Sequence, residues 1–154
     1  MEWLAEMITN PFFLTGAMAW FLAQVIKTAI HFFIYRKLDL KRMIGDGGMP
    51  SGHSATVISL AVMTCLVCGP ASAEFGISLW FAIIVCHDAT GVRRETEKQA
   101  FLITELIKSF EMLFEEQQLP EVKLKKFVGH TPVQVFAGIL VGIATAFAMY
   151  AILY

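Results

Sequence analysis

The chain of 154 residues is 56% hydrophobic and only 16% charged, whereas about a quarter of the residues in a typical soluble domain carry a charge. Its 12 basic and 13 acidic residues give a net charge of −1, so the bulk charge gives no indication of a nucleic-acid or an acidic partner. We expect no nucleic-acid partner. With a mean hydropathy of +0.63, this composition excludes an ordinary soluble enzyme. It predicts one integral membrane domain, residues 1–154, with several helical spans.

The first apolar stretch covers residues 11–35 and predicts a transmembrane helix. It follows Glu2 and Glu6 rather than a basic segment, which favours a retained span over a cleaved signal peptide. Lys27 and His31 interrupt the stretch one turn apart. A lysine inside a span is costly unless its ammonium group reaches the interface or lines a polar cavity, and both interpretations stay open for Lys27. We expect His31 to be an interfacial or supporting residue rather than a ligand.

Residues 52–68 and 71–87 form the second and third apolar stretches and predict a hairpin of two short spans. All three cysteines lie in these stretches, and we expect them to be packing residues. The preceding run Gly47-Gly48-Met49-Pro50-Ser51-Gly52-His53-Ser54 predicts a tight loop with Ser51 as the N-cap of the next helix. The free N–H groups of such a helix start can bind an anion, which His53 would face. An ordinary turn and cap is the alternative interpretation.

The third stretch ends at His87 and Asp88, and Arg93 and Arg94 follow closely. Asp88 is interpreted as an ion-pair partner or as a carboxylate that orients a catalytic group. The arginines are interpreted as anchors at the membrane face or as phosphate ligands.

Residues 89–130 are predicted to form a cytoplasmic insertion with an amphipathic helix in its middle. Its apolar positions recur at helical spacing: Leu102, Leu106, Phe110 and Leu113. This helix could pack on its own protein, lie on the bilayer, cover the site, or pair with a second copy in a homo-oligomer.

The fourth apolar stretch covers residues 131–154 and is preceded directly by His130. Pro132 suits the first turn of a helix, and His130 and Gln134 would then lie one turn apart on one face. A histidine at one helix start is commonly structural. Two histidines, His53 and His130, at two helix starts on one membrane face favour a phosphate site.

The basic residues are distributed asymmetrically along the chain. All 12 lysines and arginines lie near or beyond the end of the first stretch, or between the third and the fourth. Basic residues gather in cytoplasmic loops, so the charge pattern predicts both basic loops in the cytoplasm and both termini outside. The expected fold is an all-α, polytopic bundle in the inner or plasma membrane, with about four transmembrane helices and one amphipathic cytoplasmic helix.

Several short motifs resemble one family along nearly the whole chain. Pro50-Ser51-Gly52-His53 resembles the central motif of the type 2 phosphatidic acid phosphatase superfamily. His130 to Gly142, read as His-x-x-x-Gln-Val-x-x-Gly-x-x-x-Gly, resembles its third motif. Gly47-Gly48-Met49 and Asp88-Ala89-Thr90-Gly91-Val92-Arg93-Arg94 are similar to marks of its divergent branch, described as acid phosphatase/vanadium-dependent haloperoxidase-related.

The resemblance implies a role for each site residue. His130 would be the nucleophile that forms a phosphohistidine, and His53 the general acid. The phosphoryl oxygens would be held by Lys27, Arg93 or Arg94 and by backbone N–H groups around Ser51 and Gly52. Because lysine and arginine would supply the positive charge, we expect no metal and no other cofactor.

The chain departs from the family pattern at three places. The first motif usually has lysine and arginine seven residues apart, but here Ile34 stands seven after Lys27, and Arg36 is a weak substitute. The arginine of the third motif normally shortly precedes its histidine, whereas a long insertion separates Arg94 from His130.

The third departure is Gln134, which stands where an acidic residue normally orients the nucleophile. An amide cannot stabilise an imidazolium by charge, so we expect reduced turnover, unless Asp88 takes the orienting role.

The resulting hypothesis is a cytoplasm-facing phosphatase of a phospholipid or polyprenyl phosphate. The alternative is a catalytically impaired protein that binds lipid phosphates or serves a structural role. A small transporter is a weaker alternative. Apart from Lys27 and His31, we expect the spans to lack polar residues that would line a path across the membrane.

Overall fold

The computed structural model describes residues 2–36, 48–113 and 131–154. These residues form helices and no strand, which confirms the predicted all-α membrane bundle. The helices are α1 (Glu2–Thr9), α2 (Pro11–Tyr35), α3 (Gly52–Cys68), α4 (Ala73–Thr90), α5 (Val92–Leu113) and α6 (Pro132–Leu153).

Short polar side chains set where the apolar helices begin. The side chain of Asn10 accepts from the backbone N–H of Phe12 at 2.9 Å, and Pro11 occupies the first position of α2. Ser72 caps α4, and Thr131 caps α6 with Pro132 in its first turn, as expected for Pro132. Caps of this kind satisfy backbone donors that the helix itself leaves without a partner.

The helix α4 runs further than the sequence pattern suggested. It was expected to end near residue 87, but it continues through His87 and Asp88 to Thr90, and α5 begins after Gly91. Polar residues at the exit of a span end its apolar run but not its backbone hydrogen bonds. Residues 87–90 include no glycine or proline, so the helix continues until Gly91.

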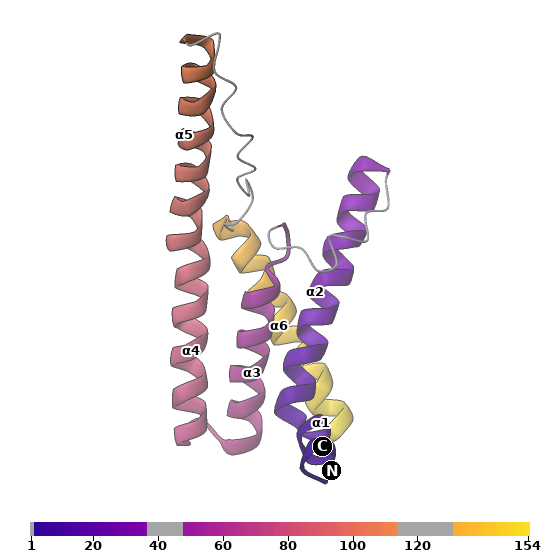
Figure 1. Ribbon diagram of the computed structural model, residues 1–154. Coiled ribbons are helices and arrows are strands. Elements are labelled where there is room, and N and C mark those ends of the chain that lie inside the picture. Colours follow the sequence, from indigo (N-terminus) through magenta and orange to yellow (C-terminus); the bar gives the residue numbers. More distant parts are fainter. Residues whose placement is uncertain (1, 37–47, 114–130) are drawn as a thin grey trace.

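The helix α3 lies at the centre of the bundle, in contact with α2, α4 and α6 (Figure 1). His53 and Cys68, near its two ends, are its exposed residues. The buried core around it is built from small side chains, including Ala19, Ala23 and Ala55. Small side chains let helix backbones approach closely, which is how helices associate in a lipid environment.

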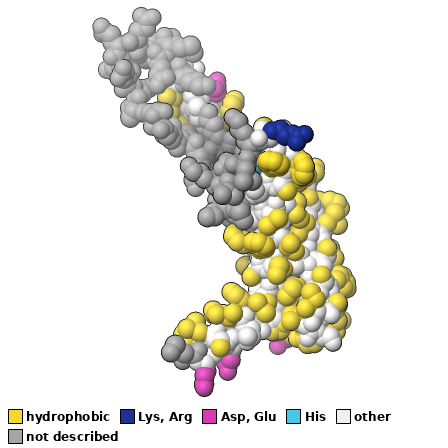
Figure 2. Space-filling model, turned by 90° about the vertical axis from the view of Figure 1, so that its right-hand side faces the viewer, with side chains coloured by type: hydrophobic (Ala, Val, Ile, Leu, Met, Phe, Trp, Pro, Cys, Tyr) yellow, Lys and Arg dark blue, Asp and Glu magenta, His cyan; other side chains and the backbone are white. Residues whose placement is uncertain are grey.

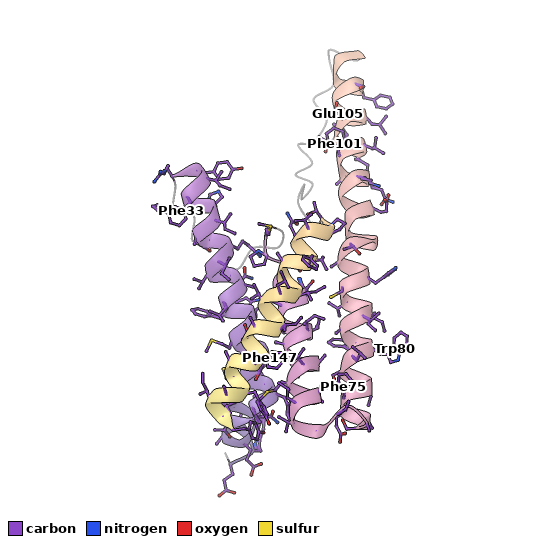
Figure 3. The ribbon with its side chains drawn as sticks, turned by 180° about the vertical axis from the view of Figure 1, so that it is seen from behind. Phe33, Phe75, Trp80, Phe101, Glu105 and Phe147 are labelled. Carbon is purple, nitrogen blue, oxygen red and sulfur yellow. The ribbon has the colours of Figure 1, made fainter. Side chains whose placement is uncertain are left out.

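The large apolar side chains point outward rather than into this core. Figure 3 shows Phe33 and Trp80 directed away from the bundle, and their exposed fractions are 70% and 65%. In Figure 2 hydrophobic side chains cover most of the visible face of the bundle. Such an apolar exterior suits contact with acyl chains.

Among the residues that the structure describes, three helices are long and apolar enough to cross a membrane: α2, α4 and α6. The central helix α3 is also apolar but has 17 residues, which corresponds to about 25 Å. Both termini and the turn between α3 and α4 lie at one end of the bundle (Figure 1). The starts of α3 and α6 and the end of α2 lie toward the other end.

Candidate active site at the starts of α3 and α6

The first turn of α3 is organised by Ser51. This serine is fully buried, and its Oγ accepts from the backbone N–H of Ser54 at 3.3 Å, which confirms the predicted N-cap. The hydroxyl of Ser54 lies 3.0 Å from the same Oγ. The chain reaches Ser51 through Gly48, which has a φ of +88°, and through a cis peptide bond between Met49 and Pro50.

Lys27 of α2 is held against this loop. Its side chain is only 5% exposed. A Cβ atom added to Gly48 would lie 3.3 Å from both Cγ and Cδ of Lys27, so the loop covers the aliphatic part of the lysine. Of the two interpretations of Lys27, this burial favours a cation inside a polar site over an ammonium group that reaches into the interface.

The first turn of α6 is docked directly onto the first turn of α3. The backbone N–H of Ser51 donates to the carbonyl oxygen of Gln134 at 2.9 Å. A Cβ atom on Gly138 would lie 2.5 Å from the carbonyl oxygen of Ser51, and one on Gly142 would lie 2.6 Å from that of Ala55. Only glycine permits this approach, because no real Cβ could occupy either position.

This docking concerns both histidines of the predicted site. His53 is the second residue of α3 and is exposed. His130 lies outside the described residues, but it precedes Thr131, the N-cap of α6, by one position. The start of α3, which carries His53, is therefore adjacent to the start of α6, which follows His130 in the sequence.

Gln134 takes part in the cap of α6. Its Oε1 accepts from the backbone N–H of Thr131 at 3.1 Å, while the Thr131 hydroxyl accepts from the backbone N–H of Gln134 at 3.4 Å. This reciprocal pair is a capping box. Gln134 therefore stabilises the helix start that follows His130 in the sequence.

The other predicted site residues belong to a different side of the bundle. Asp88 is partly buried in the last turn of α4, and Arg93 and Arg94 fall in the first turn of α5. In the described part of the chain, α4 contacts α3 and α6 but not α2. Arg36 is exposed and ends α2 nine residues beyond Lys27, about 13 Å along the helix axis, so it is not beside Lys27.

Sequence reasoning missed one polar residue, Gln24. It lies in α2, three residues before Lys27, and is 5% exposed. A Cβ atom on Gly52 would lie 3.7 Å from its Nε2 atom and 3.6 Å from the Trp20 ring, so Gln24 faces the start of α3. A single amide in a long apolar stretch barely changes the mean hydropathy. The signal that could have identified Gln24 is its three-residue spacing from Lys27, which puts both residues on the same helix face.

These groups together suit a phosphoryl anion. The first turn of α3 presents backbone N–H groups, and the buried Lys27 adds a positive charge beside the loop. Within residues 2–36, 48–113 and 131–154, no three His, Cys, Asp or Glu side chains are grouped as metal ligands would be. Among the described residues, Lys27 and the backbone N–H groups of the helix start offer positive charge to an anion at this end of α3.

Comparison with known proteins assigns the chain to a family. The sequence model of the divergent PAP2 family matches residues 8–145. The chain is also 40% identical over 146 residues to the uncharacterized membrane protein YuiD of Bacillus subtilis (strain 168), covering 90% of this chain and 92% of that protein. No solved structure matches the chain. The protein belongs to the divergent PAP2 family, as its motifs predicted.

Proposed function

We propose that this member of the divergent PAP2 family is a membrane phosphatase that hydrolyses a lipid or isoprenoid phosphate at the cytoplasmic face. The observation that carries the proposal is the hydrogen bond from Ser51 N–H to the Gln134 carbonyl oxygen. It joins the helix start that carries His53 to the one that follows His130, beside the buried Lys27. In the proposal, His130 is the nucleophile, His53 the acid and Lys27 the cation at this end of α3.

The proposed reaction has two displacements. In the first, a nitrogen of His130 attacks phosphorus, while His53 donates a proton to the leaving alkoxide oxygen as the P–O bond breaks. In the second, His53 accepts a proton from water as the water oxygen attacks phosphorus. The P–N bond then breaks and releases inorganic phosphate. Lys27 and the first N–H groups of α3 stabilise the charge on the equatorial oxygens in both steps.

The position of the candidate site along the bundle supports a lipid substrate. The helix α2 continues past the start of α3 (Figure 1), so Lys27 and Ser51 lie below the end of an apolar helix. A phosphorylated head group can reach this depth while its acyl or prenyl chains remain among the helices. Phosphatidylglycerophosphate, phosphatidate and polyprenyl phosphates are the candidate substrates. The positive-inside pattern favours a site in the cytoplasmic leaflet.

The proposal is tested by phosphate release from vesicles that contain each candidate lipid. We expect wild-type protein to release phosphate, and His130→Ala and His53→Ala to reduce the rate by at least about 10²-fold. Phosphohistidine is labile in acid and stable in alkali, so a reaction on 32P-labelled lipid stopped in alkaline SDS should give a 32P-labelled protein with wild type and none with His130→Ala. If no candidate lipid is hydrolysed and both variants behave as wild type, the phosphatase proposal is wrong.

A second function is favoured by one residue, Gln134. With an amide in place of the usual acidic residue, the protein would bind lipid phosphates without turning them over. Gln134→Glu separates the two functions. A glutamate can also complete a capping box and suits a helix N-terminus, so the substitution leaves the α6 start intact. An impaired enzyme should gain activity from the added charge, whereas a binding protein should not.

A further inference from the structure

The α2 face that contains Lys27 holds two buried atoms without a hydrogen-bond partner. These are Oε1 of Gln24 and Nδ1 of His31, and no other side-chain atom of the described residues shares this condition. Gln24 lies three residues before Lys27 and His31 four residues after it, so both lie on its helix face. Buried polar atoms without partners are rare, and they commonly mark a position where a ligand or water binds.

Several other buried polar side chains among the described residues have hydrogen-bond partners, in contrast to Gln24. The hydroxyl of Thr15, on the same helix, donates to the carbonyl oxygen of Pro11 at 2.7 Å. Those of Thr64 and Thr145 donate to carbonyl oxygens in their own helices at 2.7 and 2.8 Å. A glutamine amide is too far from its own helix backbone to be satisfied in this way, so Gln24 needs a partner from elsewhere.

The position of Gln24 indicates where that partner would lie. Its Nε2 atom is 3.7 Å from where a Cβ atom of Gly52 would stand, at the first residue of α3. The N–H groups at such a helix start lack carbonyl partners within the helix and favour an anion. Gly48, three residues before the helix cap Ser51, packs on the side chain of Lys27. The Gln24 amide, the Lys27 side chain and the start of α3 thus surround one location.

We propose that Gln24 is a phosphoryl-binding residue, which contacts an oxygen of the substrate's phosphate group together with Lys27 and the N–H of Gly52. An amide offers a donor at one end and an acceptor at the other, and a half-turn of the group exchanges them. It can therefore bind an ionised phosphoryl oxygen or a protonated one. This inference rests on the proposed function for its substrate, but it concerns binding and does not require turnover.

Glycine at position 52 fits this assignment. A methyl group there would meet Trp20 and Gln24 at 3.6–3.8 Å, which is ordinary van der Waals contact, so the protein itself tolerates alanine. The methyl group would instead occupy space in front of the helix start. Gly16→Ala is a matched control, because its Cβ would meet Thr56 at 3.6 Å in the same contact between α2 and α3. We expect Gly52→Ala to weaken phosphate binding and Gly16→Ala to leave it unchanged.

The direct test measures binding of inorganic phosphate to the full-length protein in detergent by isothermal titration calorimetry, with lipid phosphate hydrolysis measured in parallel. We expect Gln24→Leu to lower the affinity for phosphate by about tenfold or more, because a hydrogen bond to a charged group is lost. Thr15→Val, which removes a hydroxyl bonded only within α2, should bind phosphate as wild type does. If Gln24→Leu does not fold, Gln24→Asn takes its place in the test. It keeps the amide but shortens the side chain by one methylene, so we expect it also to lower the affinity for phosphate.

The outcomes separate this inference from the proposed function. Wild-type protein that binds phosphate but hydrolyses no lipid, with Gln24→Leu impaired in binding, supports Gln24 and defeats the phosphatase proposal. Hydrolysis with equal phosphate affinity in wild type, Gln24→Leu and Gln24→Asn overturns the inference and leaves the phosphatase proposal standing. In that case a water molecule satisfies the amide. Wild-type protein that binds no phosphate also overturns it.

Discussion

The starts of α3 and α6 differ from the arm formed by α4 and α5 in how closely they pack. At the starts of α3 and α6, glycines bring backbone against backbone, and the Gly138 position leaves no room for a Cβ atom. Along the α4–α5 arm, residues 73–113, a Cβ atom on Gly76 would meet nothing within 4 Å, and large side chains such as Trp80 and Leu106 are exposed.

The difference shows which part of the molecule has a fixed geometry. A site that must hold a phosphoryl group needs its groups placed to within a fraction of an ångström, and close backbone contact provides this. A surface against lipid or water carries no such requirement. Paired substitutions, one at the site end and one in the arm, test whether the contrast is functional.

The largest contrast is expected between two lysines. Replacement of Lys27 by methionine keeps much of the buried side-chain volume but removes the charge, so phosphate release should fall by about 10²–10³-fold. Lys98, which is exposed on α5 and paired with Glu95, should tolerate methionine with little change in rate. Initial rates on lipid vesicles measure both. Equal rates in the two variants would mean that Lys27 is not part of the site.

The next contrast compares two glycines. Gly138→Ala places a methyl group 2.5 Å from the Ser51 carbonyl oxygen, a backbone atom that cannot move aside cheaply. It should lower the free energy of unfolding by about 1–3 kcal/mol and reduce phosphate binding. Gly76→Ala, with open space around it, should stabilise the protein by about 0.5–1 kcal/mol. Unfolding by SDS in mixed micelles gives both values, and similar values would refute the close contact.

A smaller contrast compares two N-caps. Ser51→Ala and Ser72→Ala each remove a side-chain oxygen that accepts from a backbone N–H in the first turn, and each should cost about 1 kcal/mol of stability. Only Ser51→Ala should also weaken phosphate binding, because Ser72 caps α4 at the opposite end of the bundle (Figure 1). Calorimetric titration with phosphate separates them. If both variants bind phosphate normally, the α3 start does not position the anion.

The smallest effect is expected on α5. Leu106 is 59% exposed, so Leu106→Gln should change the stability of the protein in detergent by less than about 0.5 kcal/mol. The measurement is again unfolding by SDS. A loss of more than about 1 kcal/mol would show that another surface covers this face of α5, and analytical ultracentrifugation would then tell whether a second copy does so.

Much of the fold could be predicted because its signals are local. Apolar length predicted the four apolar helices, and Ser51 and Pro132 predicted where α3 and α6 begin, since caps and first-turn prolines act on the backbone beside them. The short helix α1 was missed. All of its residues are exposed, and eight residues carry too little periodicity to stand out.

The interior of the site could not be predicted, because it depends on contacts between distant segments. Gly138 was recognised as part of a family motif, but nothing in its spacing says that it touches the Ser51 carbonyl oxygen. Gln24 was passed over because hydropathy averages a single amide into its apolar surroundings. Its burial against Gly52 is a property of the packing of α2 on α3.

The shortness of α3 has a consequence for the surrounding bilayer. It has 17 residues where α2 has 25, a difference of 8 residues or about 12 Å along the axis. Since α2, α4 and α6 surround α3, the outer helices respond to bilayer thickness by tilting, while α3 is shielded from it. In the proposed function, a lipid head group would therefore have to sink below its neighbours to reach Ser51. Turnover should accordingly depend on the acyl-chain length of the host lipids and not only on the identity of the phosphorylated one.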